Sequence, residues 1–133
     1  MKSIKISIPS LIENIKIIES FIDNAKESFE INDDIYGNIM ISVTECISNA
    51  IIHGNRGDKN KLVNLELKME DDQLKFIIQD EGQGFDLSEL PDPTSPENLE
   101  KPGGRGIFLI RHLSDEVKFE EGGKKTILSF YMD

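Results

Sequence analysis

Two runs of alternating apolar and polar residues, joined by a short polar turn, constrain the fold of this chain more than any other feature. Apolar side chains occupy every second position from Val63 to Met69 and again from Leu74 to Ile78, and residues 70–72 between them are acidic. A period of two on both sides of a polar turn predicts a β-hairpin with one buried face. The same alternation places Asp80 on the inward side, directly after the second strand.

Similar patterns predict the N-terminal elements. Alternation from Ile4 to Ile8 indicates a half-buried strand, which we expect at an edge of the sheet. Ser10 followed by Glu13 is a capping box, and the apolar residues after it recur at spacings of three and four as far as Phe29. We therefore expect an amphipathic helix that starts at this cap.

A second helix is expected over about residues 34–53, with Asn32 or Asp33 as its N-cap. Its main aliphatic face recurs at helical spacing, but Ile41 and Ile52 lie near the opposite side. A helix that is apolar almost all round predicts a position buried in the core.

The rest of the chain completes the predicted order of elements. Residues 81–104 show no clear periodicity and hold four of the five prolines and four of the ten glycines, which indicates a long loop or lid. A third helix is expected from near Arg105, and a final hairpin turns at Gly122 and Gly123. The order strand, helix, helix, hairpin, lid, helix, hairpin predicts an α+β fold and not a doubly wound one.

Composition narrows the class of protein. The 133 residues, 38% of them hydrophobic, fit a single domain over residues 1–133. With 25 acidic and 15 basic residues, the formal charge of −10 argues against a nucleic-acid or membrane surface. Cys46 is the only cysteine, so no internal disulfide forms, and no Cys/His cluster has zinc spacing. Neither a signal peptide nor an apolar run of about 18 residues is evident, so we expect a cytoplasmic protein.

Three polar residues, Glu45, Asn49 and His53, are spaced four apart and form one stripe on the second helix. Because an unpaired carboxylate is costly to bury, such a stripe on a buried helix suggests a ligand, an ion or water facing it. The alternative to a ligand site is a partly exposed helix face whose polar groups already have hydrogen-bond partners. His53 can also simply bond the last carbonyls of the helix before Gly54.

Two glycine-containing segments could approach a ligand closely. Gly82 and Gly84 follow Asp80, although Asp-x-Gly is also an ordinary turn ending. The segment Gly-Gly-Arg-Gly at 103–106 opens a helix, where free N–H groups can bind phosphate oxygens, although glycines at helix starts are common. Neither segment is a Walker A loop or lies in a βαβ unit, so P-loop and Rossmann sites are excluded. Thr126, on an inward strand position, could touch a buried ligand or bond a carbonyl.

In this order and spacing, the motifs resemble the nucleotide-binding boxes of the GHKL ATPase superfamily, which has the Bergerat fold. They are Glu45-x3-Asn49-Ala50-x2-His53-Gly54-Asn55, Asp80-x-Gly82-x-Gly84, Gly104-x-Gly106 and Thr126. Within that superfamily, the short length and the strings Asn-Ala-x-x-His-Gly-Asn and Gly-Arg-Gly-Ile-Phe-Leu-Ile resemble the bacterial anti-sigma-factor serine/threonine kinases of partner switching.

The resemblance implies a two-layer sandwich with a mixed, mostly antiparallel sheet, helices on one face, and ATP or ADP held between the second helix and the lid. It implies that Asn49 binds Mg²⁺, that Asp80 binds the adenine amino group and that Glu45 is the general base. The other nucleotide-binding residues that it implies are Gly82, Gly84, Gly104, Gly106 and Thr126. Arg105 could help to hold the phosphates.

The leading functional hypothesis is an enzyme that phosphorylates a serine or threonine of an anti-sigma antagonist and alternatively sequesters a sigma factor, as a homodimer. Phosphoryl transfer needs positioning, magnesium and a proton acceptor, and a carboxylate and an amide one helical turn apart can supply the last two functions. The alternative is a nucleotide-gated binding module without kinase activity. The presence of Glu45 argues against this alternative. A stand-alone histidine-kinase ATP-binding domain ranks last, since no long dimerising helix precedes the domain.

Overall fold

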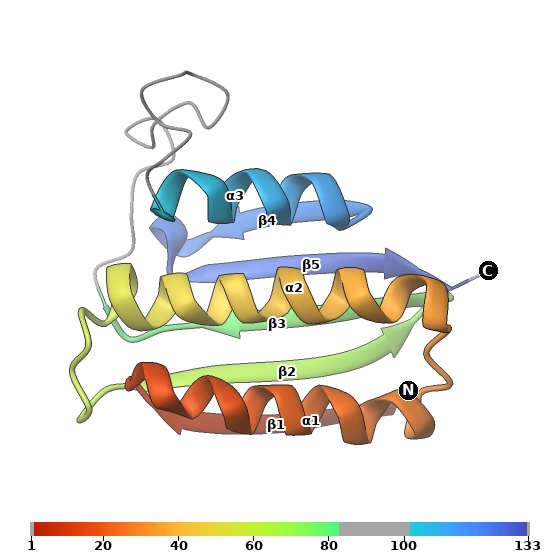
Figure 1. The fold of residues 1–133 in the computed structure, drawn as a ribbon, viewed down its shortest axis with the longest axis horizontal. Coiled ribbons are helices and arrows are strands. Elements are labelled where there is room, and N and C mark those ends of the chain that lie inside the picture. Colours follow the sequence, from red (N-terminus) through yellow and green to blue (C-terminus); the bar gives the residue numbers. More distant parts are fainter. Residues whose placement is uncertain (1, 83–101, 133) are drawn as a thin grey trace.

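The computed structural model describes residues 2–82 and 102–132, which form a five-stranded sheet with a layer of helices on one face (Figure 1). The strands are β1 (Lys2–Pro9), β2 (Leu62–Glu70), β3 (Gln73–Gln79), β4 (Glu116–Glu120) and β5 (Lys125–Tyr131). The helices are α1 (Ile15–Ser28), α2 (Asp33–Asn49) and α3 (Pro102–Leu113). Shorter helical turns are η1 (Ile12–Asn14), the π-helical turn η2 (Ala50–Gly54) and η4 (Glu121–Gly123). The α+β class and the helices on one face are confirmed.

The strand order is β1-β2-β3-β5-β4, and each of the four strand pairs is antiparallel, so the sheet of the described residues is wholly antiparallel and not mixed as the resemblance implies. β1 lies at an edge, as its alternation predicts. The first hairpin turns at Asp71 and Asp72, whose φ angles of 52° and 62° suit the left-handed turn that a twisted hairpin favours. The final hairpin turns through Gly122 and Gly123, with φ angles of 66° and 92°.

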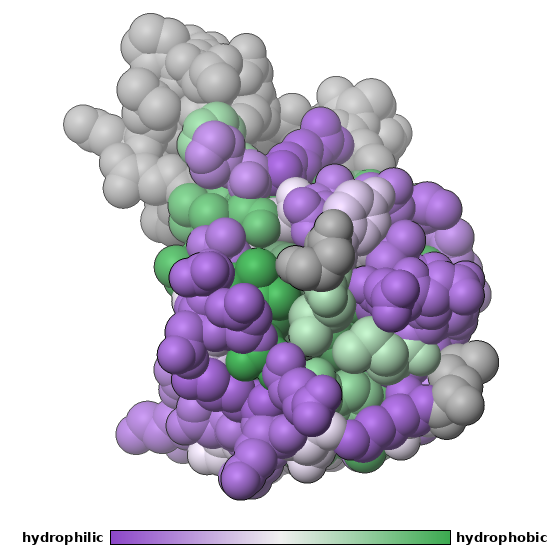
Figure 2. Space-filling view, turned by 90° about the vertical axis from the view of Figure 1, so that its right-hand side faces the viewer, coloured by the Kyte–Doolittle hydropathy of each residue, from purple (hydrophilic) through white to green (hydrophobic). Residues whose placement is uncertain are grey.

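The apolar faces of the two layers meet in one core. Leu67, Phe76 and Leu128 are paired across β2, β3 and β5, and each is 0% exposed. Val43 and Ile47 of α2, also 0% exposed, belong to the same cluster. From the side of the molecule where α2 begins, apolar side chains appear as a band with polar side chains on both sides (Figure 2). This arrangement explains why the strands alternate, since one face of the sheet packs on the helices.

α2 lies in the middle of the helix layer and contacts both α1 and α3. By length and composition alone, the 22 residues of Asp33–Gly54 could cross a membrane, but the buried side of this helix is part of the core just described. The expectation that the helix is buried all round is wrong. Ile41 and Ile52 are 44% and 49% exposed, because they lie away from the face that packs into the core.

The two predicted helix caps have different outcomes. Asn32 caps α2 as expected, with its Oδ1 accepting a hydrogen bond of 2.8 Å from the Asp34 N–H. The capping box at Ser10 is wrong, because α1 begins only at Ile15, after the turn η1, and has no side-chain cap. The Ser10 hydroxyl instead donates to the Lys61 carbonyl at 2.7 Å, a partner distant in sequence.

Candidate functional site

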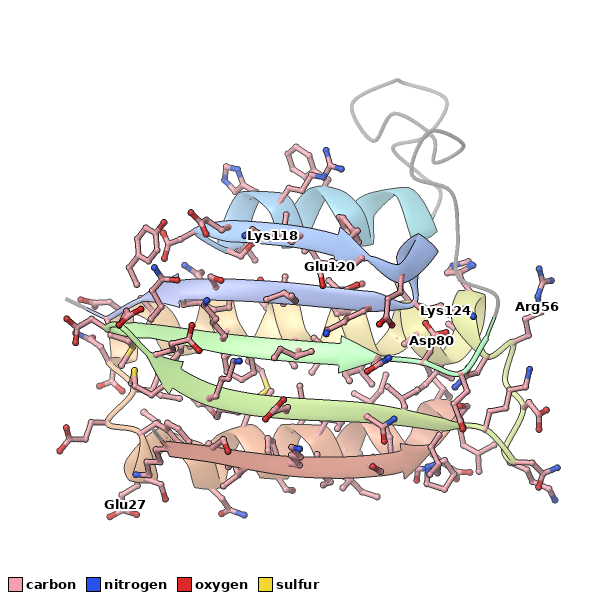
Figure 3. The ribbon with its side chains drawn as sticks, turned by 180° about the vertical axis from the view of Figure 1, so that it is seen from behind. Glu27, Arg56, Asp80, Lys118, Glu120 and Lys124 are labelled. Atoms are coloured by element: carbon pink, nitrogen blue, oxygen red, sulfur yellow. The ribbon has the colours of Figure 1, made fainter. Side chains whose placement is uncertain are left out.

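A buried carboxylate marks the end of β3. Asp80 follows the inward-facing residues of that strand and is only 6% exposed. Its N–H donates to the Lys124 carbonyl at 2.9 Å, and its Oδ1 accepts the N–H of Gly82 at 2.8 Å. Figure 3 shows Asp80 and Lys124 close together at this end of the sheet. The prediction that Asp80 points inward is confirmed.

Two glycines allow the chain to close around this carboxylate. A Cβ on Gly54 would lie 2.4 Å from Asp80 Oδ2, and a Cβ on Gly82 would lie 1.8 Å from the Gly54 carbonyl oxygen. At Gly82 the clash is with backbone, so this position requires glycine for space, whereas a Cβ on Gly54 would have to displace the Asp80 carboxylate. Gly82 is a predicted site residue, whereas Gly54 stands in the quoted motif without a predicted role.

A cleft between α2 and the sheet brings three predicted residues together: Asn49 of α2, Asp80 after β3 and Thr126 of β5. Thr126 pairs with Ile78, two residues before Asp80, and its 8% exposed side chain lines the same cleft as the carboxylate. The remaining lining residues are Cys46, Ala50, Ile78, Ile110, Phe119 and Gly123. Apolar walls with a few convergent polar groups are typical of a site for a small organic ligand.

Burial governs the electrostatics of the cleft. It raises the pKa of the Asp80 carboxyl, while the N–H of Gly82 and the ammonium groups of Lys124 and Lys61 lower it in part. Burial, with the nearby Glu45, also raises the pKa of the Cys46 thiol. Cys46 is therefore a neutral, buried side chain in the wall of the cleft.

Asn49 and Glu45 are half-buried on α2, one helical turn apart. Among the residues that the structure describes, neither side chain has a hydrogen bond or an ion pair. No described residue therefore competes with a ligand for their oxygens, although Glu45 does not line the cleft itself. His53, the third residue of the predicted stripe, is exposed on η2 and does not line the cleft.

The oxygen atoms of these side chains suit Mg²⁺ only if phosphate groups bind the same ion. Within residues 2–82 and 102–132, no group of three His, Cys, Asp or Glu side chains could hold a metal ion. Mg²⁺ commonly takes one or two protein oxygens and completes its shell with phosphates and water. The amide oxygen of Asn49 fits such a role, with the Glu45 carboxylate one turn away.

Other predicted site residues lie at or beyond the limit of the described chain. Gly84 and most of the predicted lid lie outside the described residues. Gly104, Arg105 and Gly106 are in the first turns of α3, which starts at Pro102 and not near Arg105. Proline is favoured in the first helical turn, where its missing N–H costs no intrahelical bond. α3 contacts α2 and contributes Ile110 to the cleft.

A match to a known family covers nearly the whole chain. The family model of the histidine kinase-like ATPase domain matches residues 8–132, so the chain belongs to this family, as its motifs predict. A solved structure of the RsbU and RsbW domains of Rv1364c from Mycobacterium tuberculosis has a TM-score of 0.71 over 98% of this chain and 32% of that one. At 12% identity, this likeness shows the fold alone.

Similar proteins carry the name serine-protein kinase RsbW. The protein of that name from Oceanobacillus iheyensis is 31% identical over 71% of this chain and 64% of its own length. The one from Staphylococcus aureus strain JH9 is 26% identical over 97% of this chain and 86% of its own length. The chain thus spans less than two thirds of the first relative. These relatives support the resemblance to anti-sigma-factor serine kinases.

Proposed function

We propose that the chain is an ATP-dependent serine/threonine protein kinase that phosphorylates an anti-sigma antagonist and alternatively holds a sigma factor. The observation that carries the proposal is the buried Asp80 carboxylate, which lies in one cleft with Thr126 and Asn49. The relatives named serine-protein kinase support the choice of a protein as the phosphoryl acceptor.

In the proposed complex, Asp80 accepts a hydrogen bond from the adenine amino group, and Thr126 lies on the same side. The apolar walls formed by residues such as Ile78 and Ile110 contact the flat base. Asn49 ligates Mg²⁺, which neutralises charge on the phosphates. Gly82, Gly84, Gly104, Arg105 and Gly106 complete the proposed nucleotide site.

Glu45 is the proposed base for the transfer step. The acceptor hydroxyl oxygen forms a bond to the γ-phosphorus, the bond from that phosphorus to the β,γ-bridging oxygen breaks, and ADP leaves with the electron pair. Glu45 takes the hydroxyl proton. Its half-buried carboxylate has no partner among the described residues, so no ion pair with these residues has to break before it accepts the proton.

The alternative function, a nucleotide-gated binding module, uses the same cleft and differs only in the absence of transfer. The available carboxylate of Glu45 favours the kinase. The resemblance also leads us to propose a single domain that acts as a cytoplasmic homodimer with protein partners.

Magnesium-dependent nucleotide binding tests the proposed site. We expect ATP to raise the melting temperature of the wild type, since ligand at about 100 times its Kd adds roughly 2.7 kcal/mol of stability. The rise should be larger with Mg²⁺ than with a chelator, and Asn49→Ala should remove that difference. Ser48→Ala is the matched control, because Ser48 is a half-buried neighbour on α2 that does not line the cleft. No shift of the wild type with any adenine nucleotide at millimolar concentration would refute the site.

A further inference from the structure

Asn55 lies directly after η2 and is 1% exposed, and its side-chain amide joins three segments of the chain. Its Nδ2 donates to Ser10 Oγ at 2.8 Å and to the Leu62 carbonyl at 3.0 Å. Its Oδ1 accepts the N–H of Glu81 at 2.8 Å. The reversed amide would place its oxygen against the Leu62 carbonyl and its NH2 group against the Glu81 N–H, so the partners fix its orientation.

The bond to Glu81 holds the residue that immediately follows Asp80. Beside it, Gly82 packs against the Gly54 carbonyl so closely that no Cβ fits. Consecutive residues 54 and 55 therefore contact consecutive residues 81 and 82. On the other side, the Asp80 N–H is bonded to the Lys124 carbonyl. The peptide that carries the cleft carboxylate is thus fixed from the end of η2 and from the final hairpin.

We infer that Asn55 is a positioning residue for nucleotide recognition, which sets the place of the Asp80 carboxylate relative to the helix that carries Asn49. The inference rests on the proposed nucleotide site. Asn55 does not line the cleft and so acts through Glu81 and Asp80 without touching the ligand. The N–H of Asn55 donates to the Ala50 carbonyl at 2.8 Å, which closes η2 and links Asn55 to a cleft residue on the helix side. π-Helical turns of this kind are frequent at functional sites.

The test separates positioning from general stability. Ser10→Ala is the matched control, because it removes one partner from the same buried amide but keeps the bond from Asn55 to Glu81. ATP and inosine triphosphate are the probes, since they differ at the base position where ATP carries its amino group. In Asn55→Ala and Asn55→Ser we expect ATP binding to weaken about tenfold, the size typical of losing one buried hydrogen bond, with inosine triphosphate binding unchanged. Ser10→Ala should keep the wild-type ratio of the two affinities.

A second measurement does not depend on nucleotide. In the free protein, amide hydrogen exchange of Glu81 should be slow in the wild type and in Ser10→Ala, and fast in a folded Asn55 variant. Fast exchange at Glu81 in the wild type would overturn the inference even if the Asn55 variants fail to fold. An unchanged affinity ratio in a folded Asn55 variant, or an equal loss in Ser10→Ala, would also overturn it. Failure of the wild type to bind ATP would instead refute the proposed function, whatever the exchange at Glu81.

Discussion

The carboxylate of Asp80 lies against the backbone of Gly54, at a place where a Cβ on Gly54 would be 2.4 Å from Oδ2. Gly54→Ala should therefore push the carboxylate out of position and leave the fold intact, because the side chain of Asp80 can move. We expect ATP binding to weaken at least about tenfold, as for loss of a hydrogen bond to a charged group. Titration calorimetry of the folded variant measures its affinity for ATP.

Gly37→Ala provides the control for that substitution. Gly37 is exposed within α2, and a Cβ there would have no neighbour within 4 Å. Alanine should stabilise the helix by roughly 0.5–1 kcal/mol and leave ATP affinity unchanged. Wild-type affinity in Gly54→Ala would show that the close contact with Asp80 has no role in binding.

The buried charge of Asp80 predicts opposite effects on stability and on binding. A carboxyl group whose pKa is raised on folding contributes stability below its unfolded-state pKa, and that stability is lost as the pH rises through the folded-state pKa. Because burial raises the pKa of Asp80, its charged form destabilises the native state at neutral pH. Asp80→Asn should therefore melt higher than the wild type at pH 7 in the absence of ligand, and it should lose most of the ATP-induced rise.

Melting curves between about pH 4 and pH 8 test whether folding raises or lowers the pKa of Asp80, since unfolded Asp titrates near pH 3.9. The difference between Asp80→Asn and the wild type should shrink as the pH falls and the wild-type carboxyl takes up its proton. A difference that grows toward acid pH would mean that the native state prefers the charged form of Asp80.

The reactivity of the Cys46 thiol allows the cleft to be probed in the wild-type protein. Burial raises the pKa of its thiol, so little thiolate exists at pH 8, and the side chain is only 4% exposed. We expect iodoacetamide to modify the native protein slowly and the guanidinium-unfolded protein fast, with mass spectrometry as the readout. Saturating Mg-ATP should slow the native reaction further, because Cys46 lines the cleft. A native rate equal to the unfolded rate would contradict this description of the site.

Local patterns in the sequence predict the strands, the hairpin turns and the inward position of Asp80, because alternation is a property of a single strand. They fail at Ser10, where a partner distant in sequence takes the hydroxyl that would have capped the first helix. They also miss Ile110 and Phe119 as walls of the cleft, since that contact depends on α3 packing on α2 and on β4 pairing with β5. Gly54 and Asn55 fall in the quoted motif, but only the tertiary contact with residues 80–82 reveals what they do.

Phosphoryl transfer in a single turnover, with saturating Mg-ATP and the antagonist purified from the protein's own source, tests the central claim most directly. The wild type should label a serine or threonine of the antagonist, and Glu45→Ala should bind ATP normally but transfer about 10² to 10⁴ times more slowly, the usual cost of losing a general base. Glu27→Ala, which changes an exposed acid on α1, should transfer at the wild-type rate. Equal rates in the wild type and Glu45→Ala would contradict the role of Glu45, and no transfer by the wild type would leave the nucleotide-gated binding module as the function of the cleft.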